Sequence, residues 1–225
     1  MTGMGLPTVA VGLLGLLMTP VEAAEFLVIP SLVTNVCQFL AGPNRLLLLR
    51  RMWPMLLAIS VATSAGAGLI AGVGATHATL FLGLALATYA ILGLSRVRMV
   101  VDKKYERWLS PVVGAATGVI TGATGVFVIP AVPYLQALEF DKDDLVQALG
   151  LSFTVSTIAL ALGLASYGAL HASAAGASLL CTGPALVGML AGQAVRTRME
   201  PTTFRLLFFV GLLLLSGDLI TRAII

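Results

Sequence analysis

The sequence predicts an all-α polytopic membrane protein made of two repeats, each combining a discontinuous, glycine-broken segment with three transmembrane helices. Of the 225 residues, 58% are hydrophobic and only 10% are charged. The mean hydropathy is +1.01, and the apolar stretches follow one another almost continuously. A soluble domain carries about 25% charged residues, so this chain cannot cover a water-facing surface. We expect one membrane domain and no soluble module.

Six stretches have the length and apolar character of a spanning helix, which needs roughly 20 residues. They are 23–42, 54–73, 79–95, 145–166, 172–195 and 204–224. Two further apolar stretches differ from them. Residues 3–18 form a short stretch, and residues 109–138 are too many for one straight span. The run 121–125, Thr-Gly-Ala-Thr-Gly, interrupts the longer one, and glycine is expected to break a helix there.

The two halves of the chain match each other at a nearly constant offset, as internal repeats do. Thr2-Gly3 matches Thr124-Gly125 at an offset of 122, and Pro7 matches Pro130 at 123. Gly68–Gly72 and Ser95 find their counterparts at offsets of 120 and 121. We therefore divide the chain into a first repeat (1–95), a basic loop (96–108) and a second repeat (109–225). The first repeat lacks a counterpart of 109–120, so we expect its start to be truncated.

The Lys and Arg residues of the loops predict how the chain crosses the membrane. If each glycine-rich segment crosses once, 9 of them lie on one side and 4 on the other. If each segment dips in and returns, 12 lie on one side and only Arg222 lies opposite. The second topology follows the positive-inside rule better, and it makes the repeats inverted, which is a common transporter plan.

The glycine-rich segments are the strongest candidates for a site. Non-helical backbone at membrane depth is tolerated only where protein buries it or it lines a cavity. A half-helix that starts there points free N–H groups and a partial positive charge at the membrane interior, which suits an anion. The candidates are Thr2, Gly3, Gly5 and Pro7 in the first repeat, and Thr121, Gly122, Thr124, Gly125 and Pro130 in the second. Close packing through small residues is the alternative interpretation.

The helix after each glycine-rich segment carries polar residues at matching positions. An offset of 122 places Thr34 on Ser156 and Asn35 on Thr157. These side chains could complete the hydrogen bonds of an anion, or they could join helices to one another. No Lys or Arg lies near the middle of an apolar stretch, so the predicted site binds a small anion through neutral donors, and the sequence predicts no metal site and no cofactor.

At this point the sequence resembles the sulfite exporter TauE/SafE family. The runs that carry the resemblance are Thr2-Gly-Met-Gly-Leu-Pro7 and 114–130, each followed by a polar helix. The resemblance implies a non-enzymatic permease that exports small sulfur-containing anions, such as sulfite or organosulfonates, across the bacterial inner membrane. The partners it implies are the anion and the lipid bilayer, with no nucleic acid. A homo-oligomer stays open.

Two alternatives to a permease stay open. A non-transporting subunit that scaffolds a larger complex would have the same composition. A membrane redox carrier would use Cys37 and Cys181, but these cysteines do not occupy matching positions of the two repeats. An intramembrane hydrolase is disfavoured because His77 and His171 lie outside the apolar stretches, away from any buried nucleophile.

Overall fold

The computed structural model describes residues 6–72, 75–95, 100–170, 176, 178–180, 182–185, 187–188 and 200–224. Within them the chain is helical, with no strand. The helices are α1 (Leu6–Leu14), α2 (Pro20–Leu40), α3 (Arg45–Gly72), α4 (Ala75–Leu94), α5 (Lys103–Thr124), α6 (Ala131–Ala137), α7 (Lys142–Ser166) and α9 (Pro201–Ile224). Five of them, α2, α3, α4, α7 and α9, are long and apolar enough to cross a membrane. They match five predicted spans, and the sixth, 172–195, lies largely outside the described residues.

The helix ends follow local chemistry. Helix α2 begins at a capping box, in which the Glu22 carboxylate accepts from the Thr19 N–H (2.8 Å) and the Glu22 N–H donates to the Thr19 hydroxyl (3.3 Å). This cap starts the helix before the predicted residue 23. Helix α3 begins at Arg45, nine residues before the predicted start, because charges at the end of a span can pair: Arg51 forms an ion pair with Glu106 of α5.

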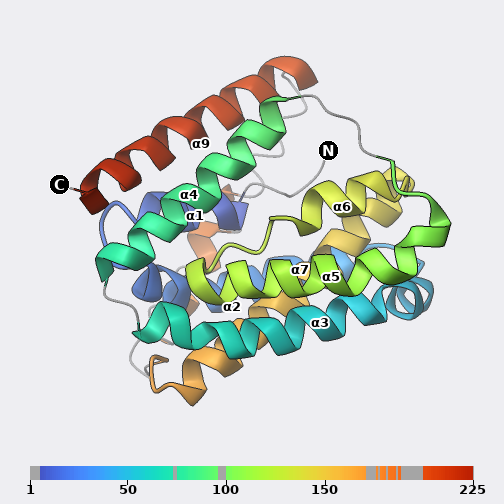
Figure 1. Cartoon of the computed structure of the whole chain (residues 1–225), viewed down its shortest axis with the longest axis horizontal. Coiled ribbons are helices and arrows are strands. Elements are labelled where there is room, and N and C mark those ends of the chain that lie inside the picture. The colour runs from blue at the N-terminus through green and yellow to red at the C-terminus, as the bar shows by residue number, and fades with distance from the viewer. Residues whose placement is uncertain are drawn as a thin grey trace.

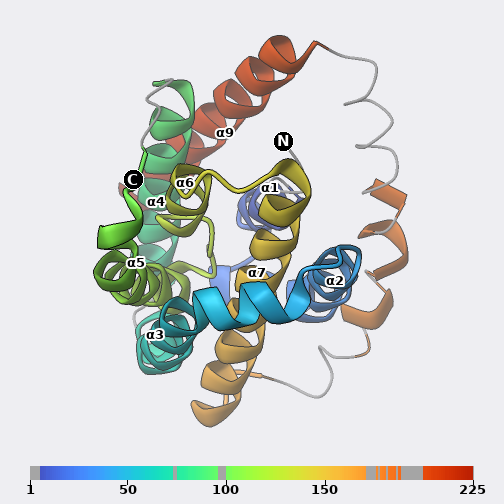
Figure 2. The same ribbon diagram turned by 90° about the vertical axis from the view of Figure 1, so that its right-hand side faces the viewer.

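Helix α7 lies in the middle of the bundle, against α2 on one side and α3 on another (Figure 2). Helices α3 and α5 run side by side in the same direction, and α4 packs on α9 (Figure 1). Glycines make the α3–α5 contact close: a Cβ atom on Gly118 would lie 2.6 Å from the Ala62 methyl group and 2.8 Å from the Ile59 carbonyl oxygen. Small residues let the two backbones approach in this way.

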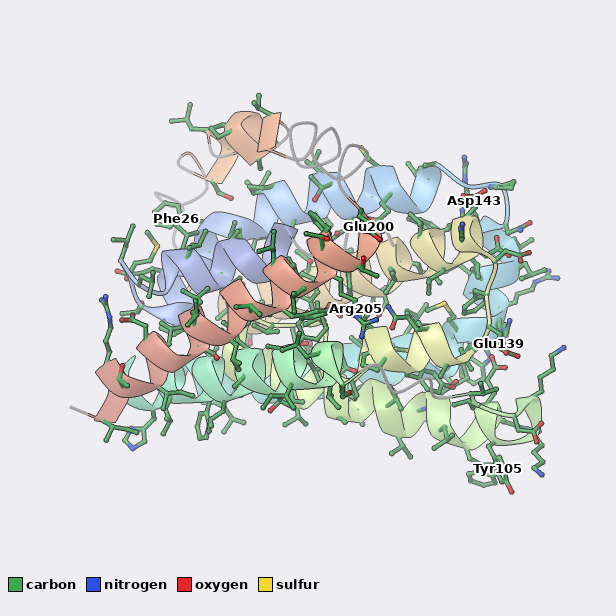
Figure 3. All side chains as sticks on the ribbon, turned by 90° about the horizontal axis from the view of Figure 1, so that it is seen from above. Phe26, Tyr105, Glu139, Asp143, Glu200 and Arg205 are labelled. Carbon is green, nitrogen blue, oxygen red and sulfur yellow. The ribbon has the colours of Figure 1, made fainter. Side chains whose placement is uncertain are left out.

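Most of the basic residues gather at one end of the bundle, which we call the basic end. It holds the starts of α3, α5 and α7, and Figure 3 shows Tyr105, Glu139 and Asp143 together there. The Val101 N–H donates to the Ala137 carbonyl (2.9 Å), so the stretch from α5 through α6 begins and ends at this end. The returning topology requires such a path for the second repeat.

Candidate functional site

The interruption of the long apolar stretch lies later than predicted. Helix α5 continues through Thr121 and Gly122 and ends at Thr124, where Gly125 takes a left-handed conformation (φ 73°) and donates its N–H to the Thr121 carbonyl (2.7 Å). Residues 125–130 then form the break between α5 and α6. Helix α5 has 22 residues and is about 33 Å long, so it is no half-helix. The break begins beside Ala24, in the second turn of α2.

The first part of the break is extended backbone in the protein interior. Val126, Phe127, Val128 and Ile129 are all at most 5% exposed. The Val126 N–H donates to the Thr124 hydroxyl (3.1 Å), and the N–H groups of the next three residues donate to no backbone carbonyl of the described residues. Unpaired backbone at this depth is tolerated where it lines a cavity or faces a ligand. The break therefore places peptide N–H groups outside regular helix in the protein interior.

Helix α7 contacts the break through Phe153 and carries two unpaired hydroxyl groups beside that residue in the sequence. The ring of Phe153 packs against the ring of Phe127, with centroids 4.9 Å apart. Ser152 and Ser156 flank Phe153 and are spaced by one helical turn. Both are completely buried, and neither hydroxyl group has a hydrogen-bond partner among the described residues. A buried polar group without a partner is uncommon and calls for an explanation such as a bound ligand.

Two more unpaired polar groups come from α2 and α3. Asn35 is 2% exposed and its amide nitrogen has no partner in the described part of the chain, and the same is true of the hydroxyl group of the fully buried Thr63. A Cβ atom on Gly150 of α7 would lie 3.0 Å from the Asn35 carbonyl oxygen, which places Asn35 two residues before the level of Ser152. Thr63 precedes Ser64, whose hydroxyl group donates to the Ala159 carbonyl of α7 (3.5 Å).

The four unpaired groups thus lie between residues 150 and 159 of α7, which span about 13 Å along the helix. They come from three helices that pack on one another, α2, α3 and α7. All four carry neutral hydroxyl or amide groups. Together they form the candidate site, and the contact of Phe153 with Phe127 links this part of α7 to the break.

The predicted threonine donors are arranged differently. The hydroxyl groups of Thr34, Thr121, Thr124 and Thr157 each donate to the carbonyl oxygen four residues earlier in the same helix, at 2.7–2.9 Å. Threonine commonly bonds its own helix in this way. These hydroxyl protons are therefore already used, and among the predicted polar residues that the structure describes, Asn35 and Ser156 keep an unused group.

The remaining predicted residues are placed as follows. Gly122 faces α3, where a Cβ atom would lie 2.7 Å from the Ala67 nitrogen, so it serves the packing of two helices. Pro130 is the residue before α6, and Pro7 is the second residue of α1. Thr2, Gly3 and Gly5 lie outside the described residues. Helix α6 has seven residues, so the partial charge at its N-terminus is small, and the anion site at a half-helix N-terminus stays a prediction.

Sequence reasoning missed Thr63 and did not select Ser152. Thr63 lies in a stretch of small residues, Ala62-Thr63-Ser64-Ala65-Gly66, whose composition is typical of helix packing. The only signal was a polar residue on a span that otherwise carries few. No group of three or more His, Cys, Asp or Glu side chains that could hold a metal ion occurs among the described residues.

A polar clamp closes the basic end above the candidate site. Gln147 of α7, 1% exposed, donates from its amide nitrogen to the carbonyl oxygens of Phe39 (2.7 Å) and Gly42 (2.8 Å). Its amide oxygen accepts from the Asn44 N–H (3.1 Å). The Asn44 amide in turn donates to the Asp144 carboxylate (2.7 Å). These bonds join the turn between α2 and α3 to the first turns of α7.

No curated protein and no solved structure matches the chain. Residues 1–219 match the protein family described as Sulfite exporter TauE/SafE. This match spans nearly all of the chain, and it agrees with the five helices that can cross a membrane. The chain is therefore a multi-pass membrane transporter that belongs to the sulfite exporter TauE/SafE family.

Proposed function

We propose that the protein is a permease that exports small sulfur-containing oxyanions, such as sulfite or organosulfonates, and that the candidate site binds the anion. The observation that carries this proposal is the set of four buried, unpaired polar groups that α2, α3 and α7 carry within a short length of the bundle. An oxyanion offers several acceptor oxygens, which match hydroxyl, amide and peptide N–H donors. Fixed neutral donors can hold an anion in a site of low dielectric without a buried cation.

The same geometry supports an inverted arrangement of the two repeats. Helix α6 ends at the basic end, beside Val101. Helix α1 leads to the opposite end, where the Leu16 carbonyl accepts from Arg222 of α9 (3.2 Å). The two short helices thus run from the interior toward opposite ends, as inverted repeats require. Under the positive-inside rule the basic end faces the cytoplasm of a bacterial inner membrane.

The direct test is anion flux into proteoliposomes that contain the purified protein, with sulfite, sulfate, thiosulfate, taurine and sulfoacetate as substrates. We expect saturable flux of one or two of them. If correctly inserted protein transported none of these anions, the result would favour the non-transporting scaffold subunit instead.

Two variants test the site itself. Asn35→Leu and Ser156→Ala remove an unpaired group without removing a hydrogen bond of the protein. Each should lower flux at subsaturating anion at least about tenfold, because a hydrogen bond to a charged ligand is worth roughly 1.5–3 kcal/mol. The melting temperature should stay the same or rise, because a buried unpaired polar group destabilises a fold.

The matched control is Thr154→Val on the same helix. The Thr154 hydroxyl group donates to the Gly150 carbonyl (2.7 Å), so this variant removes a hydroxyl group that is already paired. Its flux should resemble that of the unmodified protein. If Asn35→Leu and Ser156→Ala lost stability rather than flux, the four groups would be structural and the site assignment would be wrong.

A further inference from the structure

An open groove of about 840 Å³ lies at the basic end, between the first turns of α3 and α5. It combines two leucines, three cations and one acid. The lining residues are Leu46, Leu47, Arg50, Arg51, Lys103 and Glu106. The groove lies on the outer surface of the bundle, apart from the candidate anion site, which is enclosed between α2, α3 and α7.

The charges of the groove do not cancel. Arg51 is bound to Glu106 through two hydrogen bonds of 2.6 and 2.8 Å, and its guanidinium group stacks on the Phe140 ring at 4.4 Å. This pair joins α3 to α5 within the groove, and it neutralises Glu106, the one acidic residue among the lining residues. Arg50 and Lys103 are exposed and form no ion pair within the described ranges. Two positive charges are therefore left for an anionic group.

An apolar stripe continues from the groove along α3. Leu46, Arg50, Trp53, Leu57 and Val61 are spaced by three or four residues, which places them on one face of the helix. The four apolar members of the stripe are 57–63% exposed. Because α3 is one of the helices that can span the membrane, this face meets lipid. Arg50 and Trp53 lie toward its basic end, where cations and aromatic residues meet the headgroups.

We propose that this groove is a binding site for one anionic phospholipid. The headgroup phosphate lies between Arg50 and Lys103, and an acyl chain follows the stripe of Trp53, Leu57 and Val61. A free phosphate ion would use the two cations but not the stripe. A basic pocket between helices on the cytoplasmic side is where anionic headgroups are bound in membrane proteins. A bound lipid would link the starts of α3 and α5 beside the Arg51–Glu106 pair.

The test is native mass spectrometry of the purified protein, titrated with dioleoyl phosphatidylglycerol or with dioleoyl phosphatidylcholine, which has the same chains. We expect the first phosphatidylglycerol to bind more tightly than phosphatidylcholine. Arg50→Gln and Lys103→Gln should each weaken it about fivefold, which corresponds to the interaction of one cation with an anionic surface. Lys104→Gln is the matched control, because Lys104 is outside the groove and pairs with Asp102 (3.5 Å).

A further variant separates lipid from free phosphate. Trp53→Ser should weaken phosphatidylglycerol binding but leave both cations in place, and millimolar inorganic phosphate should not displace the lipid. The proposal would be overturned if the two lipids bound equally well, or if Lys104→Gln weakened phosphatidylglycerol binding as much as Arg50→Gln. It would also be overturned if inorganic phosphate displaced the lipid and Trp53→Ser had no effect on lipid binding. Unchanged melting temperatures of the variants exclude misfolding as the cause of a loss.

Discussion

The polar clamp at Gln147 makes a quantitative prediction about stability. Replacing Gln147 by Leu keeps the approximate volume of the side chain but removes three hydrogen bonds to the turn between α2 and α3. The carbonyl oxygen of Phe39 and the N–H of Asn44 then lose this partner, and the Gly42 carbonyl keeps only the longer hydrogen bond from Arg45 (3.3 Å). The leucine cannot replace any of them.

The size of the effect follows from these three groups. A buried polar group that loses its partner costs about 1–3 kcal/mol, but the turn is partly exposed and water can reach some of these atoms. We therefore expect a loss of about 3 kcal/mol. For a chain of this length, 1 kcal/mol corresponds to roughly 2–4 °C, so the melting temperature should fall by about 6–12 °C.

The assay is thermal unfolding in detergent, followed by the fluorescence of the native tryptophans or by loss of the monodisperse peak. Gln38→Leu provides a graded control, because the Gln38 amide makes a single bond across the same two helices, to the Val146 carbonyl (2.9 Å). It should cost about a third as much. The clamp would not hold α2 and α7 together if Gln147→Leu had the melting temperature of the unmodified chain. The same would follow if its melting temperature were no lower than that of Gln38→Leu.

Three further predictions concern single residues. Gly118→Ala should lower stability by about 1–3 kcal/mol, because its methyl group would force α3 and α5 apart, whereas Gly217→Ala, with open space around it, should be neutral or stabilising in the same melt. Gly125→Ala and Gly168→Ala should each cost about 1–2 kcal/mol, because both glycines have positive φ, but only Gly125→Ala should also lower anion flux, since it displaces the break. Thr63→Val should leave the melting temperature unchanged or raise it while reducing flux, and a clear loss of stability would contradict the assignment of its hydroxyl group to the site.

The apolar spans could be predicted because their signal is local. A run of about 20 apolar residues identifies a spanning helix without knowledge of its neighbours, and five spans were confirmed in this way. Helix α5 was not predicted as a separate span, because its first residues are charged and its apolar part belongs to the stretch 109–138, which is too long for one span. Its glycines indicated a break, but the helix continues past Gly122 because α3 packs against that face.

The candidate site could be predicted only in part, for a similar reason. Asn35 and Ser156 followed from the matching positions of the two repeats. Whether a hydroxyl group is available depends on whether its proton goes to the carbonyl four residues earlier. Thr157 uses its proton in this way and Thr63 does not, although both lie in apolar helices. That difference depends on the packing around each side chain, which a single sequence does not contain.

The close, parallel contact between α3 and α5 has a consequence for biogenesis. Helix α5 is not among the helices that are long and apolar enough to cross a membrane, so we expect its insertion to depend on packing against the small residues of α3. Equivalent positions, such as Ala62 and Gly118, are separated by 56 residues, which a ribosome synthesises in about 3–11 s. During that interval the small residues of α3 face lipid, and α4 is inserted before α5 has been synthesised. Substitutions that put larger side chains on this face of α3 would therefore lower the yield of inserted protein.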